Sequence, residues 1–299
     1  PEIARQVVTE LIDQKVVAII GSTTSGQAAA IFDLINEAKM VVISPGASSA
    51  QFSAQRDYFF RVVPTTDLMG ALMARYMYTN QHIRNLGCIY DSRNQAYAEP
   101  LWQAIQNEFE TLGGTIGQTF AFTSGASNLQ TLMTRVKAVN PEAIFFIAAG
   151  IDVALMAQYG QQQGMEDVQL FSSPWAQSPE LLEKGGQAVE GLELIAGYTP
   201  DIPYPPSLEF ARRFETRYKR QPGLLASNGY ESMLALTHAL EHTSGKTQGL
   251  AEALTTLRNV EGAYSAISLD QYGDVKRPVY IARAEKGQFT IISVVSPAE

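Results

Sequence analysis

The chain has 299 residues, of which 45% are hydrophobic and 17% charged, as in a globular protein with a substantial core. This length is typical of two domains, at about 100–200 residues per domain. With 22 Lys and Arg against 30 Asp and Glu, the net charge of −8 argues against nucleic acid or an anionic membrane as a partner, because both require a basic surface.

The start of the chain and its cysteine content bear on its cellular compartment. No apolar run approaches the about 20 residues that a membrane span needs. The chain opens in a helical pattern, PEIARQVVTELIDQ, with no secretory signal, and we expect further sequence upstream of Pro1. The single cysteine, Cys88, excludes an internal disulfide and lies in the apolar run NLGCIYD, where we expect a core residue rather than a nucleophile.

Short apolar runs rich in β-formers alternate with amphipathic helical patterns up to about residue 200. This alternation predicts parallel sheets covered by helices on both faces. The expected strands are VVAII (16–20), MVVIS (40–44), YFFRVV (58–63), NLGCIYD (85–91), GQTFAF (117–122), AIFFIAA (143–149), VQLFSS (168–173) and LELIAGY (192–198).

The pattern changes at the proline-rich segment TPDIPYPP (199–206), which we interpret as a linker because its prolines cannot continue a strand or a helix. Three helical patterns follow, at 207–220, 227–243 and 249–260. A β-rich section then runs from YSAISLD to FTIISVV (264–295), interrupted by the turn sequences QYGD and EKGQ.

The first expected strand ends in a loop of small hydroxylated residues, GSTTSG, before a helical pattern. In an open α/β sheet, ligands bind at the carboxyl ends of strands, where helix N-termini favour an anion. Thr23, Thr24 or Ser25 could add hydroxyl donors there; alternatively, one of them only caps the helix. The loop lacks the patterns GxxxxGK[ST] and GxGxxG, which argues against ATP and dinucleotides.

The second expected strand also ends in hydroxylated residues, in ISPGASSAQF (43–52). Two consecutive strands would place two such uncharged loops side by side on one sheet edge. The pair predicts a cradle of hydroxyl and N–H groups for a small anion such as a carboxylate.

No catalytic constellation stands out, and we expect neither an enzyme nor a cofactor or metal site. His238 and His242 lie four residues apart but lack the glutamate of HExxH, and the third histidine is His82. No GxSxG elbow occurs. Asp91 could be an acid, although ordering the loop SRNQAYAEP is the simpler role.

Eight stretches, in this order along the chain, carry a resemblance to a known family: VVAIIGSTTSG, VVISPGASS, YFFRVVPTTD, CIYDSRNQAYAEPL, AIFFIAAG, GLEL, SNGYESMLAL and GDVKRPVYI. Together they resemble the periplasmic solute-binding proteins of the branched-chain amino acid (Leu/Ile/Val-binding) type, which serve ABC importers. The resemblance implies the type I periplasmic binding protein fold: two Rossmann-like α/β lobes joined by three crossover strands, with the ligand between them. Lobe 1 would hold 1–63 and 199–278, and lobe 2 would hold 64–198 and 279–299. The family's first strand has no counterpart here.

The resemblance assigns roles to five residues. Ser25 falls where the family's first loop binds the ligand carboxylate with a hydroxyl. Gly46, Ala47 and Ser48 fall in the second loop, which supplies a backbone contact and a hydroxyl. Tyr97 matches a tyrosine of the second lobe, although the family's Y-G-x-G is here Y-A-E-P.

The chain departs from the family at three further ligand positions. Trp175 stands where the family has the acidic partner of the ligand ammonium, and a packing role is the alternative for this tryptophan. Gly150 or Ile151 replaces a tyrosine, and Leu225 stands near a family aromatic.

Asp152 and Glu231 are two candidates for the missing acidic partner. If neither faces the ligand, either the indole of Trp175 holds an ammonium through a cation–π contact, more weakly than a carboxylate would, or the ligand lacks an amine. The expected ligand is therefore a branched-chain or aromatic amino acid, its keto acid or an aromatic acid.

The resemblance implies an extracytoplasmic receptor that captures a small carboxylate and delivers it to the membrane permease of an ABC importer. We expect a monomer in the periplasm or outside the cell, with a lipid anchor as a further option and no nucleic-acid partner. The alternative is the ligand-binding part of a signalling receptor or amide regulator, which shares the fold.

Overall fold

The computed structural model describes residues 1–296, and their contacts separate the chain into two compact units. Unit 1 holds residues 1–66 and 202–277, and unit 2 holds 67–201 and 278–299. The chain therefore passes between the units three times. The borders of the two units lie within three residues of those expected for the two lobes. That the units act as lobes that close on a ligand stays a prediction.

The first part of unit 1 forms a small parallel sheet in the order β1-β2-β3, in which Ile19 pairs with Val42 and Val42 with Phe59. A two-stranded antiparallel ribbon, β9 with β10, belongs to its second part. The elements of unit 1 are α1 (Glu2–Asp13), β1 (Ile19–Ile20), α2 (Ser25–Glu37), β2 (Val42–Ser44), the 3₁₀ turn η1 (Ala50–Phe52), β3 (Phe59–Arg61), α8 (Pro205–Tyr218), α9 (Leu224–His242), α10 (Leu250–Thr255), β9 (Val260–Glu261) and β10 (Ala266–Ile267).

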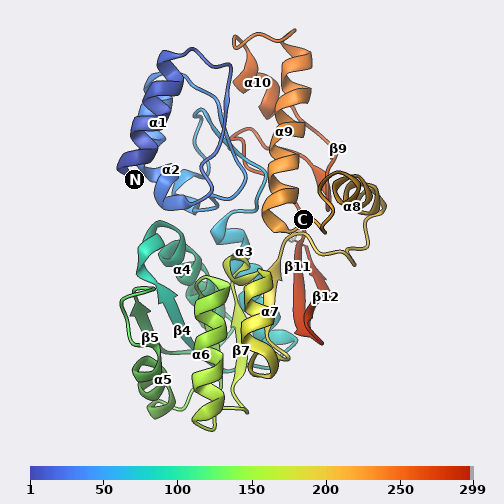
Figure 1. Cartoon of the computed structure of the whole chain (residues 1–299). Helices are drawn as coiled ribbons and strands as arrows, with labels where there is room; N and C mark the ends of the chain where they lie inside the picture. Colours follow the sequence, from blue (N-terminus) through green and yellow to red (C-terminus); the bar gives the residue numbers. More distant parts are fainter. Residues whose placement is uncertain (297–299) are drawn as a thin grey trace. The chain divides into compact units, whose positions relative to one another are not determined.

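Helices cover both faces of this sheet because successive side chains of a strand point to opposite faces. Val42 and Phe59 pack with side chains of α1 and α2, including Val8 and Ile31. Ile43, Phe60 and Val62 pack instead with α9 and α10. In Figure 1, α1 and α2 (blue) lie on one side of unit 1, and α9 and α10 (orange) lie on the other. The unit is therefore assembled from two segments that are distant in sequence.

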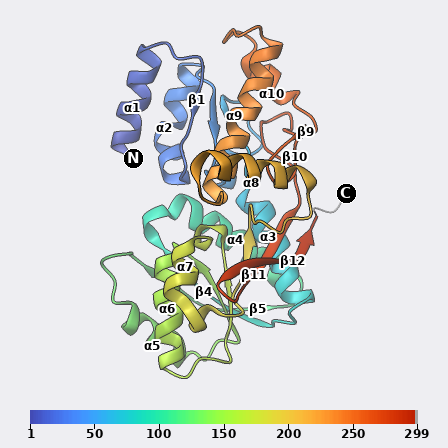
Figure 2. The ribbon, with the colours of Figure 1, turned by 45° about the vertical axis from the view of Figure 1, so that its right-hand side comes forward.

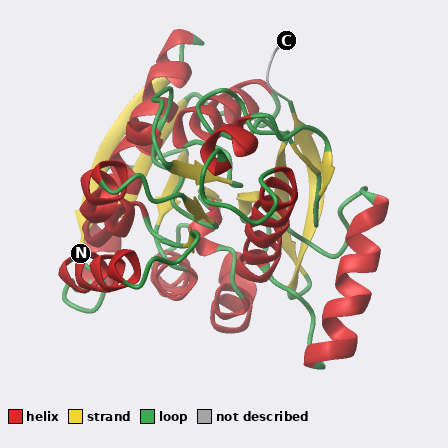
Figure 3. Ribbon diagram, turned by 90° about the horizontal axis from the view of Figure 1, so that it is seen from above, coloured by secondary structure: helices red, strands yellow, loops and turns green. Residues whose placement is uncertain are grey.

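Unit 2 contains a seven-stranded sheet in the order β12-β11-β8-β7-β6-β4-β5. Figure 3 distinguishes the helices (red), strands (yellow) and loops (green) of the chain. The elements are α3 (Thr66–Thr79), β4 (Asn85–Asp91), η2 (Ser92–Asn94), α4 (Gln95–Thr111), β5 (Thr115–Phe122), α5 (Leu129–Ala138), β6 (Ala143–Ile147), α6 (Gly150–Gln162), β7 (Gln169–Ser172), η3 (Pro174–Ala176), α7 (Pro179–Gly185), η4 (Gly186–Val189), β8 (Glu193–Ala196), β11 (Val279–Glu285) and β12 (Gln288–Val295).

All eight strands expected before residue 200 overlap an observed strand, and the mixed α/β fold with helix-flanked parallel sheets is confirmed. The strands expected before residue 200 pair in parallel, and β11 and β12, from the β-rich section after residue 264, add an antiparallel edge. β11 runs antiparallel to β8, because β8 leads out of unit 2 while β11 leads back into it. β12 then returns along β11 through a two-residue turn at Lys286 and Gly287, both with positive φ, as such hairpins require (Figure 2).

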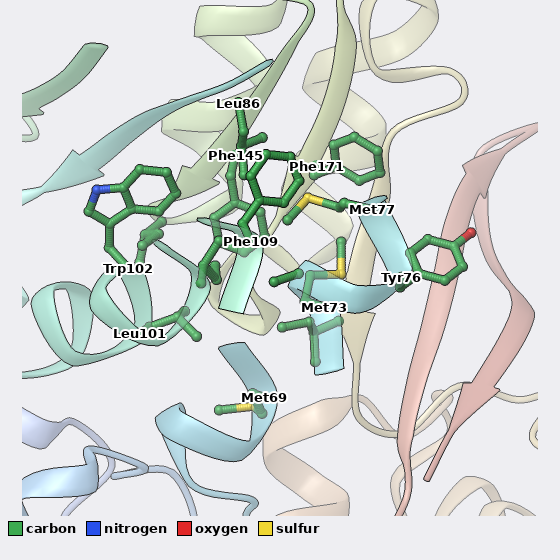
Figure 4. Packing of buried hydrophobic residues seen from close by; sticks show 14 of the residues in the cluster. Met69, Met73, Tyr76, Met77, Leu86, Leu101, Trp102, Phe109, Phe145 and Phe171 are labelled. Atoms are coloured by element: carbon green, nitrogen blue, oxygen red, sulfur yellow. The ribbon is translucent and has the colours of Figure 1, made fainter. Parts of the chain in front are cut away.

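One face of the unit 2 sheet is buried under α3 and α4. Leu86, Phe145 and Phe171 from the strands pack against Met73 and Phe109 of these helices in one apolar cluster (Figure 4). Cys88 belongs to the same cluster and is 1% exposed, so it is a core residue as expected. Within residues 1–296, no helix combines the length and the apolar character that crossing a membrane requires.

We expect Phe109→Ala to lower the free energy of unfolding by about 3–5 kcal/mol, because the ring is fully buried and the cavity would not collapse completely. It also lies edge-on to Tyr78, with ring centroids 5.8 Å apart. Urea denaturation measures the loss. The control is Val139→Ala, at a side chain that is 41% exposed, which should change stability by less than about 0.5 kcal/mol. Equal effects of the two substitutions would contradict this packing.

Candidate functional site

The sequence left two roles open for the hydroxyls between β1 and α2, capping of the helix and donation to an anion. The structure assigns these roles to different residues. Thr24 is the N-cap of α2, and its side chain accepts a hydrogen bond from the backbone N–H of Gln27 at 3.3 Å. Capping therefore falls to Thr24. Ser25, the first residue of the helix, is instead 1% exposed, and its Oγ accepts the backbone N–H of Ser49 at 3.2 Å.

The loop after β2 is held against the first loop by Ser44. The Ser44 hydroxyl donates to the carbonyl of Ser22 at 2.5 Å and accepts the N–H groups of Gly46 at 3.2 Å and Ala47 at 2.8 Å. Gly46 is required here, because a Cβ on it would lie 2.4 Å from the carbonyl oxygen of Thr23. The two hydroxyl-rich loops are thus in contact, as their positions after neighbouring strands predict.

Donors for an anion at this edge come from Ser25 and Ser48. The Ser25 oxygen accepts from Ser49, so its own proton can be donated elsewhere. Ser48 is 4% exposed, and its carbonyl accepts the N–H of Thr66 at 2.8 Å. Within residues 1–296, neither the N–H nor the hydroxyl of Ser48 has a hydrogen-bond partner. Ala47, by contrast, uses its N–H on Ser44 and buries its methyl group in the core.

Arg61, at the end of β3, was not recognised in the sequence, where YFFRVV indicated only a strand. Its side chain is fully buried and makes three hydrogen bonds, from Nε to Asp274 Oδ1 at 2.6 Å, from Nη1 to the Ser49 carbonyl at 2.6 Å and from Nη2 to Ser53 Oγ at 2.8 Å. An arginine alone in an apolar run is the signal that could have revealed it, because a buried charge needs partners. Arg61 thereby holds the loop that carries Ser48 and Ser49.

Tyr97 and Trp175, from α4 and η3 of unit 2, are brought together. Their rings meet edge to face, with centroids 6.1 Å apart, and Trp175 also packs on the apolar cluster under α3 and α4. The packing role considered for Trp175 is therefore real, although the side chain stays partly exposed. Both residues lie near the carboxyl ends of the parallel strands.

Three buried polar atoms that follow the carboxyl ends of β4, β6 and β7 along the chain lack a hydrogen bond within the described residues. They are Tyr97 Oη, Ser173 Oγ and Asp152 Oδ2, on residues 6%, 0% and 5% exposed. Burial raises the pKa of Tyr97, and the neighbouring Ser173 hydroxyl opposes the rise without forming a hydrogen bond of regular geometry. Buried polar groups are rarely left unpaired, so these atoms mark a place where a ligand or water would bind.

Asp91 is the last residue of β4, and Asp152 lies in the first turn of α6, after the neighbouring parallel strand β6. Asp91 is fully buried, accepts the backbone N–H of Arg93 at 3.1 Å and forms an ion pair with its guanidinium at 2.8 Å. The hydrogen bond from Arg93 Nε to Asp91 Oδ2, at 2.9 Å, raises the pKa of Arg93, and the Asp152 charge adds a smaller contribution. Asp91 therefore orders its loop, while one oxygen of Asp152 stays available.

Three other candidates are placed less favourably for ligand contact. Gly150 begins α6, and a Cβ there would lie 2.4 Å from Ser178 Oγ, so packing alone requires the glycine. Leu225 is 64% exposed at the start of α9. Glu231 is fully buried, and it accepts Arg277 Nη1 at 2.8 Å and the Ala263 N–H at 2.8 Å, so it is not available as an ammonium partner.

The remaining reactive side chains show ordinary surroundings. Burial raises the pKa of the Cys88 thiol well above its usual value. His238 lies 3.8 Å from Glu241, and His242 contacts the carbonyl of His238, both on α9. Across the part of the chain that the structure describes, no group of three or more His, Cys, Asp or Glu side chains could hold a metal ion.

Comparison with known proteins assigns the chain to a family. Residues 1–288 match a family model described as periplasmic binding protein. The Leu/Ile/Val-binding protein homolog 1 of Brucella suis is 23% identical over 272 residues, covering 90% of this chain and 72% of that protein.

Two solved structures are similar over nearly the whole chain. The leucine binding protein of Thermotoga maritima has a TM-score of 0.91 and 27% identity, covering 98% of this chain and 84% of that one. An ABC-transporter solute binding protein of R. palustris, in complex with benzoate, has a TM-score of 0.88 and 16% identity, covering 99% and 82%. The latter likeness concerns the fold alone.

We expect Arg61→Met to lower the free energy of unfolding by about 3–5 kcal/mol, because it leaves the largely buried Asp274 carboxylate without its partner. Urea denaturation measures the change. The matched control is Arg75→Met, which breaks an ion pair of the same 2.6 Å length whose arginine is 47% exposed, and it should cost no more than about 1 kcal/mol. Similar losses in both variants would show that Arg61 is not a buried organiser of the loop.

Proposed function

Because the chain belongs to the periplasmic binding protein family, we propose that it is a solute receptor that binds a small carboxylate with an apolar body for an ABC importer. The observation that carries the proposal is the set of free donors on Ser25 and Ser48, at the carboxyl ends of two neighbouring strands. The family consists of solute-binding proteins, and binding of this kind needs no catalytic group.

The donor set suits a carboxylate. The Ser25 hydroxyl and the N–H and hydroxyl of Ser48 provide three donors without a cation, and the Ser25–Ser49 contact keeps the two loops together. The N-terminal end of α2, where Ser25 lies, adds favourable potential for a negative charge. Gly46 contributes by allowing the loops to approach, and Ala47 by fixing the backbone that leads to Ser48.

Residues of unit 2 would recognise the rest of the ligand. Trp175 and Tyr97 offer aromatic surface for an apolar body. Asp152 has one buried carboxylate oxygen without a partner among residues 1–296, and an ammonium group would satisfy it. An α-amino acid with an apolar side chain is therefore the first candidate, with Asp152 replacing the acidic residue absent at Trp175.

A second ligand class has support of its own. The partly exposed indole of Trp175, at the position where the family has an acidic residue, favours a keto acid or an aromatic acid without an amine. Gly150 and Leu225 stay candidates of lower weight, because packing explains the first and the second is mostly exposed.

The partner of a receptor of this family would be the membrane permease of the importer. The family indicates a location outside the cytoplasm. We propose a monomer, with a lipid anchor as one means of retention, and a sensor in a signalling receptor as the second function. Two observations separate the two functions. Pull-down of an ABC-importer permease by the protein supports the receptor, and a signalling domain fused to this chain in the full precursor supports the sensor.

We expect Ser25→Ala and Ser48→Ala each to weaken binding of the cognate carboxylate about tenfold or more, since a hydrogen bond to a charged group contributes about 1.5–3 kcal/mol. Isothermal titration of ligand-depleted protein measures the affinities. Thr24→Ala is a control that removes the helix cap and leaves both donors in place. Wild-type affinity in both serine variants would eliminate this carboxylate site.

Asp152 decides between the two ligand classes. If the ligand carries an ammonium, Asp152→Asn should weaken leucine, isoleucine or valine binding about tenfold or more, because the charge partner is lost. If the ligand is an amine-free acid, the same variant should bind 4-methyl-2-oxopentanoate or benzoate within about twofold of wild type.

Thermal shifts with all five compounds identify the class, since ligand at a hundredfold excess over its Kd should stabilise the fold by about 2.7 kcal/mol. Glu110→Gln, at an exposed acid of α4, is the control. Strong binding of a branched-chain amino acid that Asp152→Asn leaves unchanged would remove Asp152 from the site.

A further inference from the structure

Two buried hydroxyl groups of unit 2, those of Tyr97 and Ser173, are not explained by the folding of the unit. Tyr97 lies in the first turn of α4 and is 6% exposed, and Ser173 lies between β7 and η3 and is 0% exposed. Neither hydroxyl oxygen has a hydrogen bond of regular geometry within residues 1–296. Buried polar groups are rarely left in this state, so each of the two requires an explanation.

The fold uses the other parts of both residues. The Tyr97 ring belongs to the apolar cluster under α3 and α4 and meets Trp175 edge to face, with ring centroids 6.1 Å apart. The backbone of Ser173 donates to the Phe146 carbonyl at 2.9 Å and accepts the N–H of Ala176 at 3.1 Å, while its side chain does not cap η3. Phenylalanine and alanine would make these contacts equally well, so packing does not account for the two hydroxyls.

The adjacent Ser172 shows how a hydroxyl that the fold does use is placed. Ser172 is 0% exposed, like Ser173, but its Oγ donates to the carbonyl of Phe146 at 3.1 Å. The two serines therefore share their burial and differ in whether the side chain has an acceptor in the protein. Ser172 is for this reason a matched control for Ser173.

The hydroxyls of Tyr97 and Ser173 are neighbours. Burial raises the pKa of the Tyr97 phenol, and the nearby Ser173 hydroxyl opposes the rise. The phenol is thus protonated at neutral pH, and the pair holds two protons. Whichever hydroxyl donates to the other, only one proton is used between them, and the second has no acceptor in the described part of the chain. The pair therefore offers one buried donor together with free lone pairs.

This count of protons selects the chemistry of the group that would bind there. An ammonium group only donates, so it would leave the second proton of the pair without an acceptor. A hydroxyl group can accept that proton and donate its own to a free lone pair, and it satisfies both side chains. The rings of Tyr97 and Trp175 beside the pair favour a hydroxyl that is carried by an aromatic ring.

We propose that Tyr97 and Ser173 recognise a hydroxyl group on the body of the ligand, so that the receptor prefers a hydroxylated aromatic acid to its unsubstituted parent. The inference rests on the proposed function, because it takes the ligand carboxylate to be held by Ser25 and Ser48. It applies to amino acids and to acids without an amine, since members of both classes can carry such a hydroxyl. It narrows the apolar body of the ligand to an aromatic body with one polar group.

Calorimetry with matched ligand pairs tests this preference: tyrosine against phenylalanine, and 4-hydroxybenzoate against benzoate. Within a pair only the ligand hydroxyl differs, so the ratio of the two affinities does not depend on how the carboxylate is held. Wild-type protein should bind the hydroxylated member of at least one pair about tenfold or more tightly, because the parent leaves a buried donor unpaired. A ratio below about twofold for both pairs, or binding of none of the four acids, would overturn the proposal.

Tyr97→Phe and Ser173→Ala locate the preference. Each should lower the affinity ratio at least about threefold, and the double variant should bring it to within about twofold of one. The controls Ser172→Ala and Tyr76→Phe remove buried hydroxyls that have partners in the protein, and they should leave the ratio unchanged. If Tyr97→Phe and Ser173→Ala weakened both members of a pair equally, the two hydroxyls would hold a group common to both acids, and the proposal would be wrong.

Two further measurements separate this inference from the proposed function. In ligand-depleted protein, Ser172→Ala should lower the melting temperature and Ser173→Ala should not, because only the first variant loses a hydrogen bond within the protein. Equal losses would give the Ser173 hydroxyl a structural partner and overturn the inference. Ser25→Ala should weaken both members of a pair equally and keep their ratio. Unchanged affinities in Ser25→Ala, with the tenfold ratio retained, would refute the carboxylate site alone.

Discussion

The buried guanidinium of Arg61 is the interaction on which the hydroxyl-lined edge of unit 1 depends. It joins β3 to the loop at Ser49 and Ser53 and to Asp274, 213 residues further along the chain. A buried cation is tolerated only where acceptors surround it, so these groups must meet for unit 1 to fold. The loop that presents Ser48 is therefore positioned by a segment from the other end of the sequence.

The same chemistry fastens the rest of the returning segment. Arg277, the last residue of unit 1, pairs with Glu231 of α9 at 2.8 Å and lies 4.4 Å over the ring of Tyr264. Six residues later, Arg283 of β11 pairs with Glu193 of β8 at 2.8 Å. A chain that crosses between units three times needs anchors where it re-enters each one, and arginine, with its rigid fork of donors, suits that task.

The two ends of the unit 2 sheet differ in how their buried polar groups are engaged. At the carboxyl end, Tyr97 Oη, Ser173 Oγ and Asp152 Oδ2 are buried and have no hydrogen-bond partner within residues 1–296. At the amino end, the Glu193 carboxylate accepts hydrogen bonds from Arg283 and Gln81, and the Tyr76 hydroxyl lies beside it. Burial without a partner costs free energy, so the carboxyl end suggests binding, whereas the amino end is explained by packing.

The sequence by itself determined the elements and one half of the candidate site. Strands are read from short apolar runs and helices from their periodicity, and both signals are local. The hydroxyl loops at Ser25 and Ser48 were predictable because consecutive parallel strands must end at the same sheet edge. The resemblance to solute-binding proteins added the fold and the residues of unit 2.

Only the tertiary structure decided which of these groups are engaged and which are free. It assigned capping to Thr24 and left the Ser25 proton available, and it enclosed Glu231 with Arg277 while leaving an oxygen of Asp152 unpaired. It also turned β11 antiparallel to β8. These outcomes depend on contacts between segments tens to hundreds of residues apart, and no local pattern of burial or charge encodes which distant partner a polar group will meet.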